Sequence, residues 1–83
     1  MSSAGSARIR ARRPFTATAA VRSRMRELGI KTAHELSWRA RVPELDVRYF
    51  GLLSHDLETL GRLSVALDWP PGHLPALWGG GPS

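Results

Sequence analysis

The chain has 83 residues, of which 42% are hydrophobic, it contains no cysteine, and its formal net charge is +5. This length accommodates one small domain, and the absence of cysteine excludes both a disulfide framework and a cysteine-ligated zinc site. No run approaches the roughly 20 apolar residues of a transmembrane helix, and no apolar block follows the N-terminal arginines, so we expect a cytoplasmic protein.

The charge is distributed unevenly along the chain. Residues 1–41 contain ten arginines and lysines and two glutamates, for a net charge of +8, whereas residues 42–83 contain two arginines and five carboxylates, for a net charge of −3. This asymmetry favours a polyanionic partner, with nucleic acid ahead of an anionic membrane or an acidic protein. The alternative interpretation is that arginine serves only to keep the surface soluble.

A basic segment opens the chain, with the sequence MSSAGSARIRARRP at residues 1–14. It has no periodic apolar residues, so we expect a flexible arm that ends at Pro14. Two interpretations of this arm stay open: it follows the minor groove or the phosphates of DNA, or it is a solvated tail. The residues concerned are its four arginines, Arg8, Arg10, Arg12 and Arg13.

The first helix is predicted in the segment FTATAAVRSRMRELG. Its apolar residues recur at the i, i+4, i+7 spacing of one helix face: Val21, Met25 and Leu28. Thr16 or Thr18 is available as the N-cap, and Gly29 is expected to end the helix. The opposite face of this helix is rich in arginine.

Two short helices are predicted next, separated by a tight bend. Thr32 and Glu35 form a capping-box pattern, in which each side chain satisfies an unpaired backbone N–H, and this predicts a second helix over residues 33–40. Pro43 interrupts the pattern and suits the first turn of a new helix. We therefore expect a third helix over residues 43–50.

The last part of the chain predicts two more helices. Asp56 can cap a fourth helix, whose leucines recur at spacings of three and four residues: Leu57, Leu60, Leu63 and Leu67. A short fifth helix is predicted after Pro71, and residues 79–83 are expected to form a disordered tail. Since no alternating strand pattern occurs, the sequence predicts an all-α fold of five helices.

The segment TAHELSWRARVPELDVRYF resembles the helix-turn-helix of the lambda-repressor/Cro-like (XRE) family. The small and apolar positions that face inward in that motif are matched by Leu36, Ser37, Ala40, Val42, Val47 and Phe50. The later segment DLETLGRLSVALDWPPGHL is similar to the fourth helix of the family. The resemblance covers roughly residues 19–78, and it implies a compact five-helix DNA-binding domain over residues 15–78 that acts as a transcriptional regulator.

The resemblance also implies a DNA-binding surface. The third helix would enter the major groove with Arg48, Tyr49 and Glu44 nearest the bases, and its other outward positions would be Pro43, Leu45 and Asp46. Phosphates would be contacted by Thr32, Arg39 and Arg41, together with the basic arm.

Two features depart from the family pattern. Arg41 stands where the family usually has glycine, and the left-handed conformation of that residue costs a side-chain-bearing residue roughly 1 kcal/mol, so we expect a looser turn. Glu44 and Asp46 would also bring two carboxylates towards phosphates, which requires positive surroundings.

The expected partners are double-stranded DNA and a second copy of the chain. One such domain contacts little DNA, so we expect a nucleoid-associated homodimer joined through Leu74, Leu77 and Trp78. The alternative function is a protein-interaction adaptor, antitoxin-like or anti-regulator, on the same scaffold. It would hold its partner through the exposed apolar side chains Trp38, Leu45 and Tyr49.

Nothing in the sequence favours an enzyme. His34, His55 and His73 are scattered over different elements, and we expect ordinary solvated histidines and no metal site. No nucleophile–base or paired-carboxylate arrangement is present, and we expect no cofactor.

Overall fold

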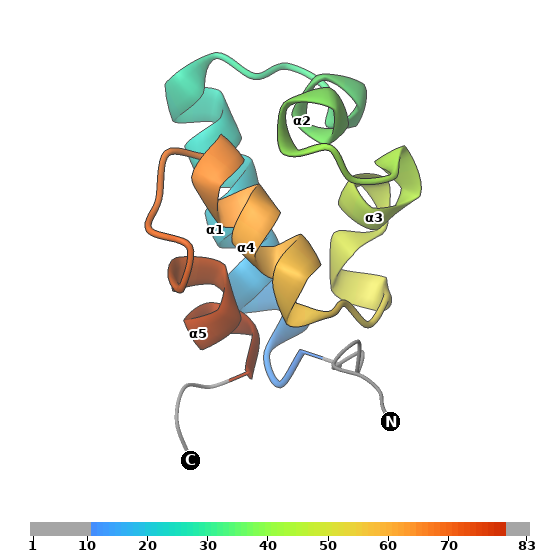
Figure 1. The fold of residues 1–83 in the computed structure, drawn as a ribbon, viewed down its shortest axis with the longest axis vertical. Coiled ribbons are helices and arrows are strands. Elements are labelled where there is room, and N and C mark those ends of the chain that lie inside the picture. The colour runs from blue at the N-terminus through green and yellow to red at the C-terminus, as the bar shows by residue number, and fades with distance from the viewer. Residues whose placement is uncertain (1–10, 80–83) are drawn as a thin grey trace.

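A bundle of short helices makes up the chain in the computed structural model, which describes residues 11–79. In chain order the elements are α1 (Pro14–Leu28), α2 (Ala33–Ala40), α3 (Glu44–Arg48), the 3₁₀ helix η1 (Phe50–Leu52), α4 (Leu57–Ala66) and α5 (His73–Gly79). No strand occurs within residues 11–79, so the predicted all-α fold of five α-helices is confirmed (Figure 1).

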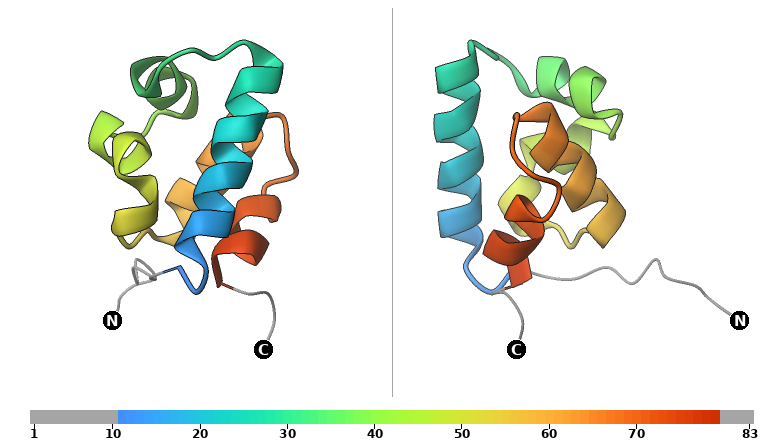
Figure 2. Two further views of the ribbon diagram at one scale, coloured as in Figure 1. Left: turned by 180° about the vertical axis from the view of Figure 1, so that it is seen from behind. Right: turned by 60° about the vertical axis from the view of Figure 1, so that its left-hand side comes forward.

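The helices are arranged around α4. Helix α1 runs along one side of the molecule, and α5 packs against both α1 and α4 (Figure 2). The α2–α3 pair occupies the other side, where α2 packs on α4 and α3 leads into η1. The two ends of the described chain meet, because the Arg12 backbone N–H donates to the Trp78 carbonyl at 3.1 Å.

The hydrophobic core is built from leucines of α2, α4 and α5 together with a few aromatic side chains. The predicted inward leucines of α4 are confirmed, since Leu60, Leu63 and Leu67 are buried. Leu57, the first residue of that helix, is exposed, and its prediction as part of the apolar stripe is wrong. As the first residue of α4, Leu57 lies outside the contacts that bury the rest of the stripe.

Local capping residues set most helix ends. Thr32 Oγ1 accepts a hydrogen bond from the Glu35 backbone N–H at 3.0 Å, and Asp56 Oδ1 accepts one from the Thr59 backbone N–H at 2.8 Å. Gly29 ends α1 in the left-handed conformation with φ 75°. These predictions are confirmed, except that the Glu35 carboxylate accepts from the Lys31 backbone N–H, at 3.3 Å, and not from that of Thr32.

The start of α1 differs from the prediction. The helix begins at Pro14, which occupies the first turn without a side-chain cap, so neither predicted threonine is the N-cap. Proline there lacks an N–H that would need a partner, and its φ is already helical. Ordered contacts reach back to Ala11, which packs against the core, so the predicted arm ends before Pro14. Its first ten residues, with Arg8 and Arg10, lie outside the described residues.

Helix α3 is shorter than the predicted 43–50 span, and η1 continues the chain after Tyr49. Gly51 in η1 lies close to α1, because a Cβ built at this position would approach Thr18 Oγ1 to 2.5 Å. A side chain at this position would require Thr18 to rotate or η1 to move away from α1.

An aromatic cluster closes the C-terminal side of the core. The Phe50 ring lies 4.6 Å from that of Trp78, and the His55 ring stacks on Phe50 at 4.9 Å. His55 is fully buried, and its Nε2 lies 3.0 Å from the Phe50 carbonyl oxygen, so the prediction of a solvated histidine is wrong at this position.

The burial of α5 also corrects the predicted dimer surface. Leu74 and Trp78 are both 0% exposed within a single chain, and Leu77 is partly buried against the same core. Fully buried side chains cannot contact a second copy, because their apolar surface is already covered by α1, α4 and η1.

No helix within residues 11–79 is long and apolar enough to cross a membrane.

Candidate nucleic-acid interface

The helix pair α2–α3 is built as the sequence predicts. Five of its six predicted inward residues are buried, and Val47 packs against the core while partly exposed. Small side chains allow α2 to approach its neighbours closely: Ala40 is buried, and Ser37 is buried with its hydroxyl donating to the His34 carbonyl at 2.7 Å.

The turn between the two helices is tight. Arg41 adopts the left-handed conformation with φ 59° and ψ 46°, the region that glycine normally occupies. The Val42 backbone N–H donates to the Ser37 carbonyl at 3.1 Å and closes the end of α2. The expected looser turn is therefore wrong: the arginine takes the strained conformation, and its own carbonyl accepts a hydrogen bond from Arg62 Nη1 at 3.2 Å.

The outward face of α3 differs from the prediction at one residue. Pro43, Leu45, Arg48 and Tyr49 are exposed as predicted. Asp46 is only 8% exposed, so its prediction as an outward carboxylate is wrong. Asp46 lies one helical turn before the buried Phe50 position, on the side of α3 that faces the rest of the domain.

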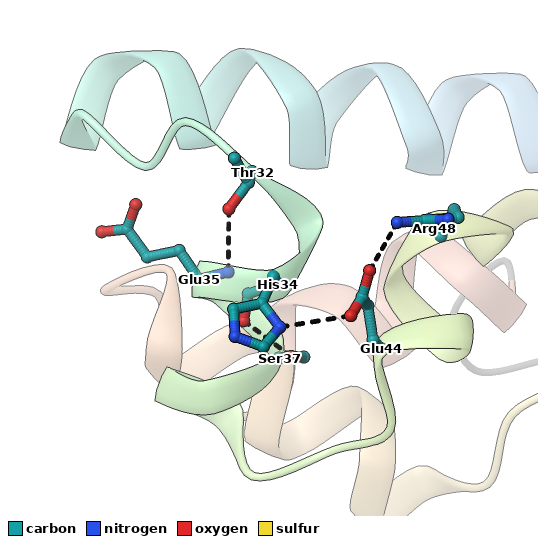
Figure 3. Close-up of polar contacts among 6 residues, drawn as sticks. All are labelled: Thr32, His34, Glu35, Ser37, Glu44 and Arg48. Carbon is teal, nitrogen blue, oxygen red and sulfur yellow. Dashed lines mark hydrogen bonds and ion pairs between the residues drawn. The ribbon is translucent and has the colours of Figure 1, made fainter.

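A polar chain links the two helices (Figure 3). His34 Nδ1 of α2 lies 3.2 Å from Glu44 Oε1 of α3, and Arg48 Nη2 donates to Glu44 Oε2 at 2.6 Å. Because a carboxylate can only accept, Nδ1 is the donor in the contact with His34. The Glu44 carboxylate therefore accepts hydrogen bonds from side chains of two helices. It is not the unpaired outward carboxylate that the sequence suggested.

Basic side chains line two shallow grooves beside the helix pair. One groove, of about 820 Å³, runs between the end of α2 and α4. Its charged walls are Arg39, Arg41 and Arg62, together with the Glu58 carboxylate, which pairs with Arg62 at 2.6 Å. Arg39 is also paired with Glu35 at 3.2 Å. The predicted phosphate contacts Arg39 and Arg41 thus lie together, and Arg62 joins them although the prediction missed it. Arg62 lies 21 residues from Arg41 in the chain, so only the fold reveals their proximity.

The second basic groove, of about 550 Å³, lies where α1 leads into α2. Its cationic walls are Arg22, Arg26 and Lys31, all exposed. The sequence analysis noted that one face of the first helix is rich in arginine, but assigned none of these residues to the site. Thr32, the predicted phosphate contact that caps α2, follows Lys31 directly.

Large apolar side chains are exposed near the same helices. Trp38, Leu45 and Tyr49 are 73%, 60% and 46% exposed, and the Trp38 ring meets the His34 ring edge at 6.1 Å. These three residues are the predicted protein-binding surface. Phe15 and Leu52 are more exposed still, at 89% and 80%, and the sequence analysis did not single them out.

The histidines do not form a metal site in the described part of the chain. No three histidine, aspartate or glutamate side chains within residues 11–79 come together as metal ligands would. His34 and His73 are exposed, and His73 lies against the Trp69 ring at 4.4 Å.

No protein family, curated protein or solved structure matches the chain. The resemblance to the lambda-repressor/Cro-like family therefore depends on the residues of the helix pair and of α4 alone.

Proposed function

We propose that the protein binds double-stranded DNA in a sequence-specific manner and acts as a transcriptional regulator, with α3 in the major groove. The observation that carries this proposal is the geometry of the helix pair. Helix α2 is capped by Thr32, the turn at Arg41 is left-handed, and α3 presents Leu45, Arg48 and Tyr49 together on its exposed side. A short helix held this way by a second helix is how helix-turn-helix proteins reach base edges.

Electrostatics favours this function more than the sequence suggested. Of the two carboxylates expected to face phosphates, Asp46 is buried and Glu44 is paired with Arg48. The exposed side of α3 therefore carries one compensated ion pair, and Asp46 does not project from that side. This arrangement lowers the repulsion that two outward carboxylates would impose on a DNA backbone.

Phosphate contacts would come from three parts of the surface. Thr32, Arg39 and Arg41 are retained from the sequence analysis, and Arg62 is added because it lines the same groove as Arg41. Arg12 is exposed at the start of the described chain, as is Arg13. On this proposal the protein acts on chromosomal DNA in the cytoplasm, with two copies on a two-fold site that meet through residues other than Leu74 and Trp78.

The test is selection of bound sequences from a random duplex library, followed by titration of the selected site and of random DNA at several salt concentrations. We expect a preference of at least about 10³ for the selected site and a log–log salt slope that grows with the number of phosphate contacts. Arg48→Ala should relax the preference at one base pair. Failure of the parent to prefer any duplex over random DNA would refute the proposal.

A second candidate function is a protein-interaction adaptor, favoured by the exposure of Trp38, Leu45 and Tyr49. Clustered aromatic and aliphatic side chains of this kind form the energetic centre of protein interfaces. Leu45→Ala combined with Tyr49→Ala would then abolish capture of a partner while leaving the affinity for random DNA unchanged. Loss of sequence preference in that double variant would instead favour DNA reading.

A further inference from the structure

We infer, on the basis of the proposed function, that Glu44 does not read a base but positions Arg48 for a guanine and ties α3 to α2 through His34. The sequence predicts Glu44 among the residues nearest the bases, where a carboxylate can accept from a cytosine amino group. The contacts in the folded chain assign it another task (Figure 3).

Both oxygens of the Glu44 carboxylate are already engaged. Oε2 accepts from Arg48 Nη2 at 2.6 Å, and Oε1 accepts from His34 Nδ1 at 3.2 Å. Each oxygen keeps a second lone pair, so a cytosine amino group could bind only beside Arg48 or beside His34. Charge-assisted hydrogen bonds are stronger than neutral ones, so Arg48 keeps its contact with the carboxylate, and that contact sets the direction of the Arg48 side chain.

Arg48 keeps enough donors to read a base while it is held. A guanidinium carries five N–H groups, and the bond to Glu44 occupies one of them. A bidentate contact to guanine O6 and N7 needs two. Arg48 is exposed, so the remaining donors are accessible. Fixing a long side chain before binding lowers the entropy lost on binding, which favours a pre-positioned arginine over a free one.

The interhelical contact distinguishes this ion pair from an ordinary one on a helix surface. The pair of Glu58 and Arg62 on α4 has the same i, i+4 spacing and the same 2.6 Å distance. The Glu58 side chain is 70% exposed, whereas the Glu44 side chain is 35% exposed and also reaches His34 on another helix. Glu44 is therefore restrained from two sides, and so is the direction in which it holds Arg48.

The experiment compares Glu44→Gln with Glu58→Gln, a control that removes the same charge and breaks the same kind of ion pair on α4. Its partner Arg62 is a proposed phosphate contact, so this control can change the affinity for every duplex but not the discrimination between bases. The proteins compared are the two glutamine variants, Arg48→Ala and the double variant Glu44→Gln/Arg48→Ala. Each is titrated against the selected site, against the site with its guanine contact replaced, and against random DNA at one salt concentration. We expect Glu44→Gln to reduce, by about tenfold, the discrimination at the base pair that Arg48→Ala relaxes. Glu58→Gln should leave that discrimination unchanged. Glu58→Gln should change the affinity for the selected site and for random DNA by the same factor.

Two further results are expected. The double variant should discriminate no worse than Arg48→Ala alone, because Glu44 acts through Arg48. His34→Ala should lose part of the same discrimination, while His73→Ala, which alters an exposed histidine of α5, should not. Thermal unfolding of each variant shows whether a change in discrimination accompanies a loss of fold, and His34→Ala supplies a second probe if Glu44→Gln is unstable.

The outcomes separate this inference from the proposed function. Sequence-specific binding by the parent, with unchanged discrimination in a folded Glu44→Gln, overturns the inference and leaves the DNA-binding function in place. A further loss in the double variant beyond that of Arg48→Ala would also overturn it, since Glu44 would then contact a base directly. A parent without any preferred sequence overturns both.

Discussion

Replacement of Trp78 distinguishes a core residue from an interface residue. Trp78 is 0% exposed, and its ring lies 4.6 Å from Phe50 and 4.9 Å from His55. Removing a fully buried tryptophan side chain costs about 3–5 kcal/mol. A chain of 83 residues has an expected unfolding free energy of roughly 4–12 kcal/mol. Trp78→Ala should therefore lose a quarter or more of the unfolding free energy, and Trp78→Phe, which keeps an aromatic ring in the cluster, should lose less than half as much.

Urea unfolding followed by far-ultraviolet circular dichroism measures this loss, with Leu77→Ala on the same helix as the control. Leu77 is only partly buried, so its truncation should cost about 1 kcal/mol. Sedimentation equilibrium of each variant over a range of protein concentrations reports the oligomeric state. If Trp78→Ala unfolded at the same urea concentration as the parent but no longer self-associated, Trp78 would be an interface residue and the reasoning from burial would be refuted.

Three other substitutions test local features of the fold, each by urea or thermal unfolding. Arg41→Gly should relieve a left-handed arginine and change stability by no more than about 1 kcal/mol in either direction, because glycine also loses more entropy on folding; a larger loss would show that the Arg41 side chain stabilises the turn. Gly51→Ala should cost about 1–3 kcal/mol, since its Cβ would meet Thr18 Oγ1 at 2.5 Å, whereas Gly72→Ala, with open space around it, should be close to neutral; equal effects would contradict the close approach of η1 to α1. Thr32→Ala should cost about 1 kcal/mol through loss of the cap on α2, and Thr32→Ser should restore most of it.

Helix ends set by neighbouring residues were predictable from the sequence. The caps Thr32 and Asp56 and the left-handed Gly29 act through residues one turn away, so their pattern is visible in the chain. The start of α1 was missed because the helix begins at Pro14 without a side-chain cap, whereas the two threonines that follow it offered a capping hydroxyl. The inward residues of α1 are those that the sequence predicts, but the helix begins earlier in the chain, at Pro14.

Features that depend on distant parts of the chain were less accessible. The apolar pattern of α5 predicts burial but not what covers it, and a partner or the same chain would satisfy it equally. In the folded chain α5 packs against α1 and α4, and Leu74 and Trp78 are fully buried without a partner chain. The approach of Arg62 to Arg41 and of His34 to Glu44 likewise requires that α4, α2 and α3 be placed in three dimensions.

The error at Asp46 has a geometric cause. The sequence predicts Val47 and Phe50 as the inward residues of the third helix. This prediction gives the helix a buried stripe only one residue wide on each turn. Helix α3 packs against α2, and Asp46, which lies one turn before the buried Phe50, is buried as well, so the covered side of the helix is wider than that stripe. The number of carboxylates on the outward side of α3 thus depends on how much of this five-residue helix is covered, and the one that stays outward, Glu44, is compensated by Arg48.

The two candidate functions share a chain of contacts, which determines which substitutions can separate them. Trp38 meets the ring of His34, His34 holds Glu44, and Glu44 holds Arg48. A substitution at Trp38 would remove apolar surface and also free the His34 side chain, so it would weaken partner binding and DNA discrimination together. Leu45 and Tyr49 lie on α3 outside this chain of contacts. Their truncation changes the apolar surface without releasing Arg48, and it is therefore these two residues, and not the more exposed tryptophan, that distinguish an adaptor from a DNA-binding protein.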